Sequence, residues 1–292
     1  GRVYPLSNSA KSVVDVINNY INKKKVTTFL NTFIDNIVIN KKGQFELLSN
    51  NERFCCDKLV IATGGKTLLN FLDSNNIKYR EFSPSLCAIR TQNTHYLNNV
   101  KLHDVKISAK NYRGRSKSEF GEILFKESGL SGIAIFNISS LFARENYFKG
   151  YLEIDLLPNF SKKDVKALLN YRKTLELSIS NFFDGLFVRE IGWEILNRCK
   201  INENRLSNQL TDDEIDKMVD AIKSLEFKVN GHYDNNQIYS GGILLDNLTS
   251  TLEHKTIKNL YFCGEICDVD GECGGFNLQW AWTSGAIIGK NI

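Results

Sequence analysis

The residues best suited to holding a ligand lie in one stretch near the C-terminal end. The apolar run Leu260-Tyr261-Phe262 is followed by an acidic turn with Glu265 and Asp268, and then by Gly275 and an apolar segment from Phe276. Strand, carboxylates, glycines and helix, in that order, are typical of the ligand crevice at the carboxyl edge of an α/β sheet. Glycines let the backbone approach a ligand, and a helix N-terminus offers N–H donors. The stretch predicts a cofactor site, although a tight turn before a buried core helix would give the same pattern.

Three carboxylates in this stretch allow two kinds of binding. Glu265, Asp268 and Asp270 could hold a divalent cation, but their spacing lacks the pattern of a calcium loop. We therefore expect no metal site. Hydrogen bonding of at least one carboxylate to ligand hydroxyls is the favoured interpretation.

The cysteines and histidines do not form a recognisable reactive group. Cys263, Cys267 and Cys273 do not have Cys-x-x-Cys spacing, and the nearest histidine in sequence is His254. Seven cysteines without a regular framework predict free thiols in a reducing compartment, and the three in this stretch are expected to be buried. No histidine has a nucleophile pattern around it, so the catalytic residues stay unknown, with Glu127 as the one weak candidate for an acid or base.

Length and charge restrict the class of protein. The chain has 292 residues, of which 42% are hydrophobic, enough for one or two substantial cores. Its net charge of +4 is small and scattered, and we predict neither a nucleic-acid nor a membrane partner. The sequence shows no secretory or membrane-spanning segment, so the expected location is the cytoplasm. Oligomeric state is left open.

The pattern of elements predicts an α/β region interrupted by a large insertion. An amphipathic helix carries Val13 and Ile17, and strands are expected over 26–30, 34–39 and 45–48. A continuous apolar strand then ends abruptly at Gly64-Gly65, as buried strands do. Alternating strands follow to about residue 155, with a helix from Ile133 to Arg144. A helical cluster covers 161–225, with a capping box predicted at Thr211.

Several of these segments, in this order, resemble one known family. They are Gly1 to Pro5, Leu59 to Gly65, Gly121 to Phe125, Gly129 to Gly132, Ile154 to Pro158, Gly241-Gly242 and Gly264 to Trp282. The chain resembles the BaiN/RdsA-type NAD(P)/FAD-dependent oxidoreductases, the flavoprotein group that includes aminoacetone oxidases. The most specific segment is the block from Gly264 to Trp282.

The resemblance implies a discontinuous, Rossmann-like FAD-binding domain of the α/β class, with two insertions. The FAD-binding domain would cover 1–80 and 238–292. An inserted β domain would cover 81–160 and 226–237, and a helical domain 161–225. The family's first βαβ segment, with its glycine-rich phosphate loop, is missing because the sequence starts after it.

The same resemblance implies which residues would contact FAD. Thr63, Gly64 and Gly65 would pass near the dinucleotide. The segment Thr32-Phe33 is similar to the strand whose backbone meets the adenine, which makes Phe33 a candidate.

Further candidates come from the C-terminal block and the N-terminus. Glu265 and Asp268 would bind ribityl or ribose hydroxyls. The residues Gly275, Phe276, Asn277 and Leu278 would direct N–H groups at the N1/O2 edge of the flavin, which becomes negative on reduction. Arg2 would place a cation near the flavin.

The leading functional hypothesis is therefore a flavin-dependent oxidoreductase that transfers hydride through FAD to or from an unknown small molecule. NAD(P)H with a reduced product, and an amine substrate with O₂ as acceptor, are both left open. Two departures from the family pattern stand out, and the first motivates an alternative, a folded remnant or interaction module that binds no FAD. One is the missing phosphate loop. The other is Lys126-Glu127, which stands where relatives often have Thr-His and leaves the substrate in doubt.

Overall fold

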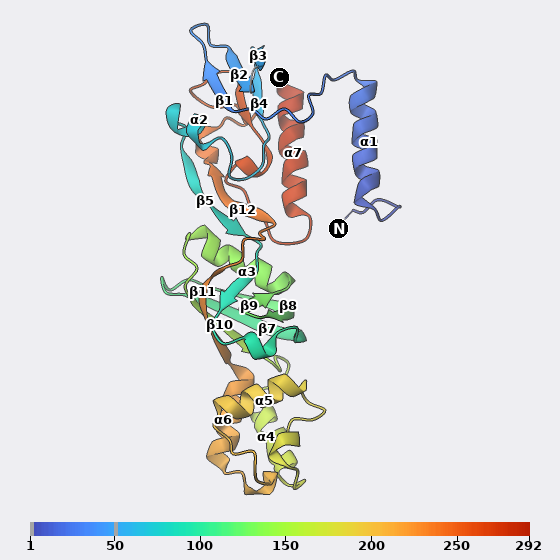
Figure 1. Cartoon of the computed structure of the whole chain (residues 1–292), viewed down its shortest axis with the longest axis vertical. Coiled ribbons are helices and arrows are strands. Elements are labelled where there is room, and N and C mark those ends of the chain that lie inside the picture. Colours follow the sequence, from blue (N-terminus) through green and yellow to red (C-terminus); the bar gives the residue numbers. More distant parts are fainter. Residues whose placement is uncertain (1–2, 50–51) are drawn as a thin grey trace. The chain divides into compact units, whose positions relative to one another are not determined.

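The computed structural model describes residues 3–49 and 52–292 and has a mixed α/β architecture. Its chain divides into two compact units (Figure 1). Unit 1 comprises residues 1–80, 243–268 and 274–292, and unit 2 comprises 81–242 and 269–273. The boundary falls within two paired strands, β5 (Tyr79–Ser85) and β12 (Ile238–Ile243).

Unit 1 combines a small antiparallel sheet, a parallel strand pair and three helices. Strands β1, β2 and β3 form the antiparallel sheet, and β4 pairs with β13 in parallel. The elements are α1 (Ala10–Lys23), β1 (Asn36–Ile39), β2 (Phe45–Ser49), β3 (Glu52–Cys56), β4 (Leu59–Ile61), α2 (Leu69–Ser74), β13 (Leu260–Phe262), α7 (Phe276–Asn291) and the short turns η4 (Leu245–Asn247) and η5 (Gly264–Ile266).

Unit 2 is built on a closed six-stranded barrel in the order β10-β11-β6-β9-β8-β7. Its strands are β6 (Ile89–Thr91), β7 (Lys101–Asn111), β8 (Ser116–Lys126), β9 (Gly129–Ser131), β10 (Gly150–Asp155) and β11 (Leu225–His232), with η1 (His95–Leu97) before β7. Side chains alternate across a strand. On β7 Val105, Ile107 and Ala109 are therefore buried, whereas Lys106 and Lys110 point outward. Helix α3 (Ile133–Arg144) packs its apolar face against β8.

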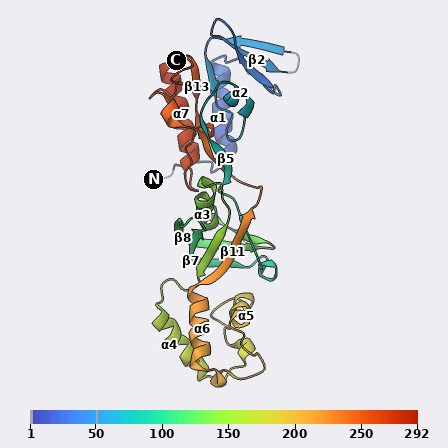
Figure 2. The same ribbon diagram turned by 90° about the vertical axis from the view of Figure 1, so that its left-hand side faces the viewer.

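The remaining elements of unit 2 are a helical cluster whose hydrophobic core is continuous with that of the barrel. They are α4 (Lys162–Lys173), η2 (Ile179–Asn181), α5 (Arg189–Arg198), η3 (Ser207–Gln209) and α6 (Asp212–Lys223). Figure 2 shows α6 running directly into β11. Helix α6 buries Ile215, Met218, Val219 and Ile222, which recur at helical spacing.

Most predicted elements are confirmed at the level of type and place. The helix from Ile133 to Arg144 has the predicted bounds, and the capping box at Thr211 forms with Glu214. One strand is wrong: residues 26–30 lie outside any strand, and Phe29 and Leu30 are exposed there. Apolar residues alone did not suffice, because a strand also needs a neighbouring strand to satisfy its backbone groups.

Candidate functional site

The parallel pair β4–β13 brings two glycine turns to one edge of unit 1. Leu59 lies opposite Leu260, and Ile61 opposite Phe262, so both strands end at the same level. The backbone N–H of Cys263 donates to the carbonyl of Ile61 over 3.1 Å, which extends the pairing by one residue. Because the carboxyl ends of parallel strands are where α/β sheets bind ligands, this edge is the candidate site.

The first turn at this edge contains Thr63, Gly64 and Gly65. The hydroxyls of Thr63 and Thr67 lie 2.6 Å apart, and the Thr67 N–H donates to the Gly65 carbonyl over 2.9 Å. Gly64 has a φ of +77°, and a Cβ there would meet no atom of the described residues within 4 Å. The turn is therefore internally braced, and the space in front of Gly64 is open.

The second turn follows β13 and is held by α7. The N–H of Gly264 donates to Oγ of Ser284 over 2.9 Å, and its carbonyl accepts a 2.9 Å bond from Nε1 of Trp280. Ser284 is fully buried and in turn donates to the Trp280 carbonyl over 2.7 Å. Two side chains one helical turn apart thus satisfy both backbone groups of Gly264 and fix the start of η5. The sequence analysis did not predict this role for Trp280 or Ser284. Their spacing of four residues could have indicated that both side chains lie on the same face of the helix.

Helix α7 begins with Gly275 as its N-cap, before the Trp280 and Ser284 side chains that hold the Gly264 turn. Gly275 has a φ of +93°, and no side chain of the described residues caps the helix. Phe276 and Leu278 are exposed and Asn277 is half-buried. The four predicted residues are therefore together at the helix start, where backbone N–H groups point out of the helix.

The alternative interpretation of this segment, a tight turn before a buried core helix, does not hold for the described structure. Only Ser284 and Ile288 are buried along it, whereas Trp282 is 56% exposed. The helix contacts η5, and Trp280 and Ile287 are half-buried, whereas Phe276 and Leu278 are exposed. Apolar composition by itself does not say which neighbours a helix has.

The acidic residues of the C-terminal block have separate partners. Asp268 in unit 1 pairs with Nε of Arg80 over 3.1 Å, and its side chain is 8% exposed. Asp270 belongs to unit 2, where it pairs with Arg144 and accepts a 3.2 Å bond from Ser240. These pairs give both carboxylates a role in the fold, so the hydroxyl-binding role of Asp268 stays a prediction. Glu265 lies in η5, half-buried, at the carboxyl end of β13.

Phe33 lies at the wall of a cavity within unit 1. The cavity has a volume of about 230 Å³ and is lined by residues 33–37 and 68–71, and Phe33 is 75% exposed at its wall. The structure thus places the predicted adenine residue near the chain that follows Thr67, within unit 1. Arg2 lies outside the described residues.

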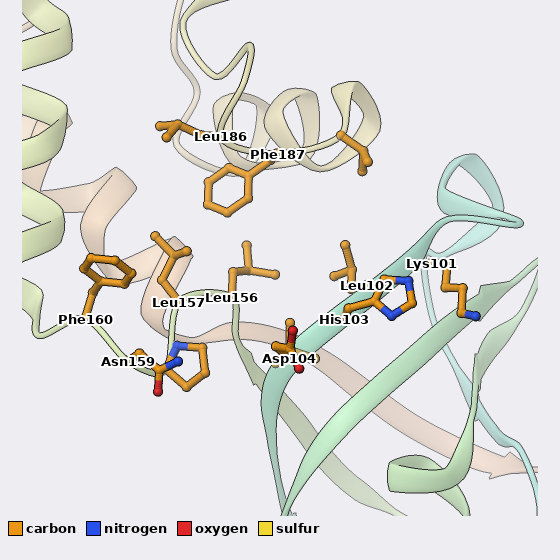
Figure 3. Close-up of a pocket in the computed structure, with 13 residues that line it drawn as sticks. Lys101, Leu102, His103, Asp104, Leu156, Leu157, Asn159, Phe160, Leu186 and Phe187 are labelled. Atoms are coloured by element: carbon orange, nitrogen blue, oxygen red, sulfur yellow. The ribbon is translucent and has the colours of Figure 1, made fainter.

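A second cavity lies within unit 2 and involves none of the predicted site residues. It has a volume of about 370 Å³ between the barrel and the helical cluster (Figure 3). Leu186 and Phe187 form one wall, and Leu156 and Leu157 face them. His103 and Asp104 lie at its side, on an irregular part of β7 where the register with β8 shifts.

All seven cysteines are free thiols, as predicted, and Cys263 and Cys267 are buried as expected, whereas Cys273 is half-buried. Burial raises the pKa of Cys267 to about 12 and that of Cys87 to about 11. Thiols with such raised values react slowly, because the thiolate is the nucleophile. Glu127, the weak acid–base candidate, is exposed, and its carbonyl accepts a bond from Thr94.

These elements define a mixed α/β protein with one parallel strand pair, β4–β13, among the described residues. The sequence model described as the HI0933-like protein Rossmann domain matches residues 1–291, and the chain belongs to this HI0933-like family. The predicted resemblance is thereby confirmed. Family membership also supports the general class of flavin-dependent oxidoreductases.

Similar proteins of known activity cover nearly the whole chain. A 3-dehydro-bile acid delta(4,6)-reductase of Clostridium scindens is 26% identical over 99% of this chain and 75% of its own length. A ribosomal RNA dihydrouridine synthase of Haemophilus influenzae is 26% identical over 97% of this chain and 73% of its own. That of Escherichia coli is 27% identical, over 97% and 72%.

No helix among the described residues has the length and apolar character needed to cross a membrane.

Proposed function

We propose that this protein is an FAD-dependent oxidoreductase whose flavin binds at the carboxyl edge of β4 and β13. The observation that carries the proposal is the parallel register, which sets the Thr63 and Gly264 turns side by side. Membership of the HI0933-like family and the similarity to a reductase support the same chemistry. We also propose the discontinuous FAD-binding domain and the two insertions, with the boundaries predicted from the sequence.

The residues at this edge fit a dinucleotide in their backbone features. A Cβ at Gly64 or Gly275 would meet no described atom within 4 Å, so a ligand can approach both turns closely. The start of α7 offers N–H donors and the positive end of the helix dipole to a phosphate or a negative flavin edge. Bound FAD would supply hydride transfer, and these backbone groups would orient it.

Side chains of the chain would complete the binding. Glu265 would accept hydrogen bonds from ribityl or ribose hydroxyls, and Phe33 would cover the adenine at the cavity wall. Asp268 would act through the fold, because Arg80 already pairs with it. Trp280 and Ser284 would hold the Gly264 turn at the height where Glu265 enters the site. For Arg2 the proposal rests on the family resemblance.

The substrate class has two candidates. A small molecule, with NAD(P)H as electron donor, is the first, and the bile acid reductase relative supports it. An RNA nucleotide is the second, because two relatives are named for dihydrouridine synthesis in ribosomal RNA. Dihydrouridine is uridine with two hydrogens added across a ring double bond, so both activities fit a reducing flavin. The earlier alternative, a folded module without FAD, has no observation in the structure that favours it.

FAD titration of the purified 292-residue chain, followed by quenching of flavin fluorescence, tests the proposal. We expect saturable binding, weakened about tenfold or more by Glu265→Ala, since a charged hydrogen-bond acceptor is lost. Glu265→Gln should lie between the two, because the amide keeps one acceptor oxygen. Glu52→Ala, an exposed change on β3, is the control and should leave the affinity unchanged. Absence of saturable FAD binding by the unaltered chain would sink the proposal.

A further inference from the structure

The outer face of the barrel carries a row of cations and tyrosines across three strands. Tyr151 on β10 lies directly opposite Lys110 on β7 and Lys228 on β11, so the three side chains project from the same face. Both lysines are exposed. Neighbouring strands are about 4.8 Å apart, so the row spans about 10 Å.

The β7–β8 hairpin extends this row. Tyr112, which is 48% exposed, stands edge to face with Tyr151 at 5.4 Å between ring centroids. The hairpin is well braced, because Oδ1 of the buried Asn111 accepts bonds from the N–H groups of Arg113 and Arg115. The aromatic faces are therefore held in place before any partner arrives.

A third tyrosine, Tyr147, contributes a contact with a cation to the same region. The guanidinium of Arg113 lies 4.7 Å from the centroid of the Tyr147 ring, and Arg113 and Arg115 both pair with Glu145. Their side chains stay 54% and 69% exposed, whereas that of Glu145 is 17% exposed. Lys149, just before β10, is also exposed.

We define the hairpin patch as Lys110, Tyr112, Arg113, Arg115, Tyr147, Lys149, Tyr151 and Lys228. It holds five cations, and the carboxylate of Glu145 pairs with two of them, Arg113 and Arg115. The next outward row, with Glu153 opposite Glu226, is acidic and bounds the patch on one side. The charge is thus concentrated, although the net charge of the whole chain is only +4.

We propose that the hairpin patch binds single-stranded RNA. Proteins bind single-stranded nucleic acids by combining cations, which contact the phosphates, with aromatic rings, on which the bases stack. A β-sheet face with exposed aromatics is also a common platform for RNA bases. An acidic protein or an anionic membrane would use the cations but not two tyrosines fixed edge to face. The proposal deepens the RNA candidate of the proposed function by naming a surface for the strand, but RNA binding at this surface does not require bound FAD.

Fluorescence anisotropy with a labelled, mixed-sequence RNA of about 15 nucleotides tests this binding without added FAD, so its outcome is separate from that of the FAD titration. We expect the triple variant Lys110→Glu, Lys149→Glu, Lys228→Glu to bind much more weakly. The slope of log affinity against log salt should fall by about 2, at about 0.7 per lost phosphate contact. A control triple, Lys163→Glu, Lys200→Glu, Lys258→Glu, has the same net charge from exposed positions outside the patch and should bind like the unaltered chain.

Two further arms separate RNA from a general attraction to polyanions. Tyr112→Leu keeps an apolar side chain but removes the stacking face, and we expect about tenfold weaker binding of the single strand. A duplex of the same sequence should bind more weakly than the single strand, because its bases are already stacked. Equal binding of duplex and single strand, no effect of Tyr112→Leu, or equal loss in both lysine triples would each overturn the proposal.

Discussion

Replacing Ser284 with alanine should loosen the Gly264 turn, because this hydroxyl is the hydrogen-bond partner of the Gly264 N–H. In the structure Ser284 is fully buried, accepts from Gly264 over 2.9 Å and donates to Trp280 over 2.7 Å. In Ser284→Ala the N–H loses its acceptor in a place where the replacement side chain cannot supply one. Leaving a buried donor unsatisfied costs about 1–3 kcal/mol.

The neighbouring residue Thr283 provides a matched control. Alanine favours the helix by up to about 0.7 kcal/mol over serine or threonine, so part of the loss is offset in both variants. Thr283 is exposed and only accepts a 3.0 Å bond from the Gln279 amide. Thr283→Ala should therefore leave the free energy of unfolding within about 0.5 kcal/mol of its original value, or raise it slightly.

Hydrogen exchange of a peptide covering residues 260–266 reports on the turn directly, and urea unfolding gives the free energy. We expect faster exchange of the Gly264 amide in Ser284→Ala alone, with a lower unfolding midpoint. If FAD binds at this edge, the same variant should also bind FAD more weakly. Unchanged exchange in Ser284→Ala, or equal acceleration in Thr283→Ala, would refute the assignment of Ser284 as the residue that holds the turn.

Two further predictions concern stability. Burial lowers the pKa of His254 below its usual 6.5, and Nδ1 accepts from the Ile257 N–H, so the neutral ring is favoured in the fold. As the pH falls, the unfolded chain binds a proton at His254 before the folded chain does. The thermal midpoint of unit 1 should therefore fall as the pH drops below about 6.5. A His254→Gln variant that kept this pH dependence would contradict the prediction. Gly129→Ala should cost about 1–3 kcal/mol or more, because a Cβ would lie 2.1 Å from the Ile89 carbonyl oxygen, whereas Gly285→Ala, in an open part of α7, should stabilise by about 0.5–1 kcal/mol. Calorimetry compares the two glycine variants, and a destabilised Gly285→Ala would show that α7 is packed more closely than described.

The local elements and the family could be predicted from the amino-acid sequence. Helical and strand periodicity located α3 and β4, the capping box marked the start of α6, and the glycine-rich block identified the HI0933-like family. Such features are readable because each depends on residues within a few positions of one another. The wrongly predicted strand at 26–30 has the same cause. Its residue types are typical of strands, but in the described structure no neighbouring strand pairs with it.

Only the tertiary structure decided which distant residues meet. Asp268 is 188 positions from Arg80 (268 − 80), and its ion pair cannot be read from either neighbourhood. Lys110, Tyr151 and Lys228 look like scattered charges and a lone tyrosine along the chain, and the sequence accordingly predicted no nucleic-acid partner. The barrel register places them in one row, because cross-strand neighbours are set by pairing and not by spacing in sequence. The glycine turns at the β4–β13 edge needed both sources of information. The sequence showed where the glycines lie along the chain, and the parallel pairing of β4 and β13 brings the two turns together.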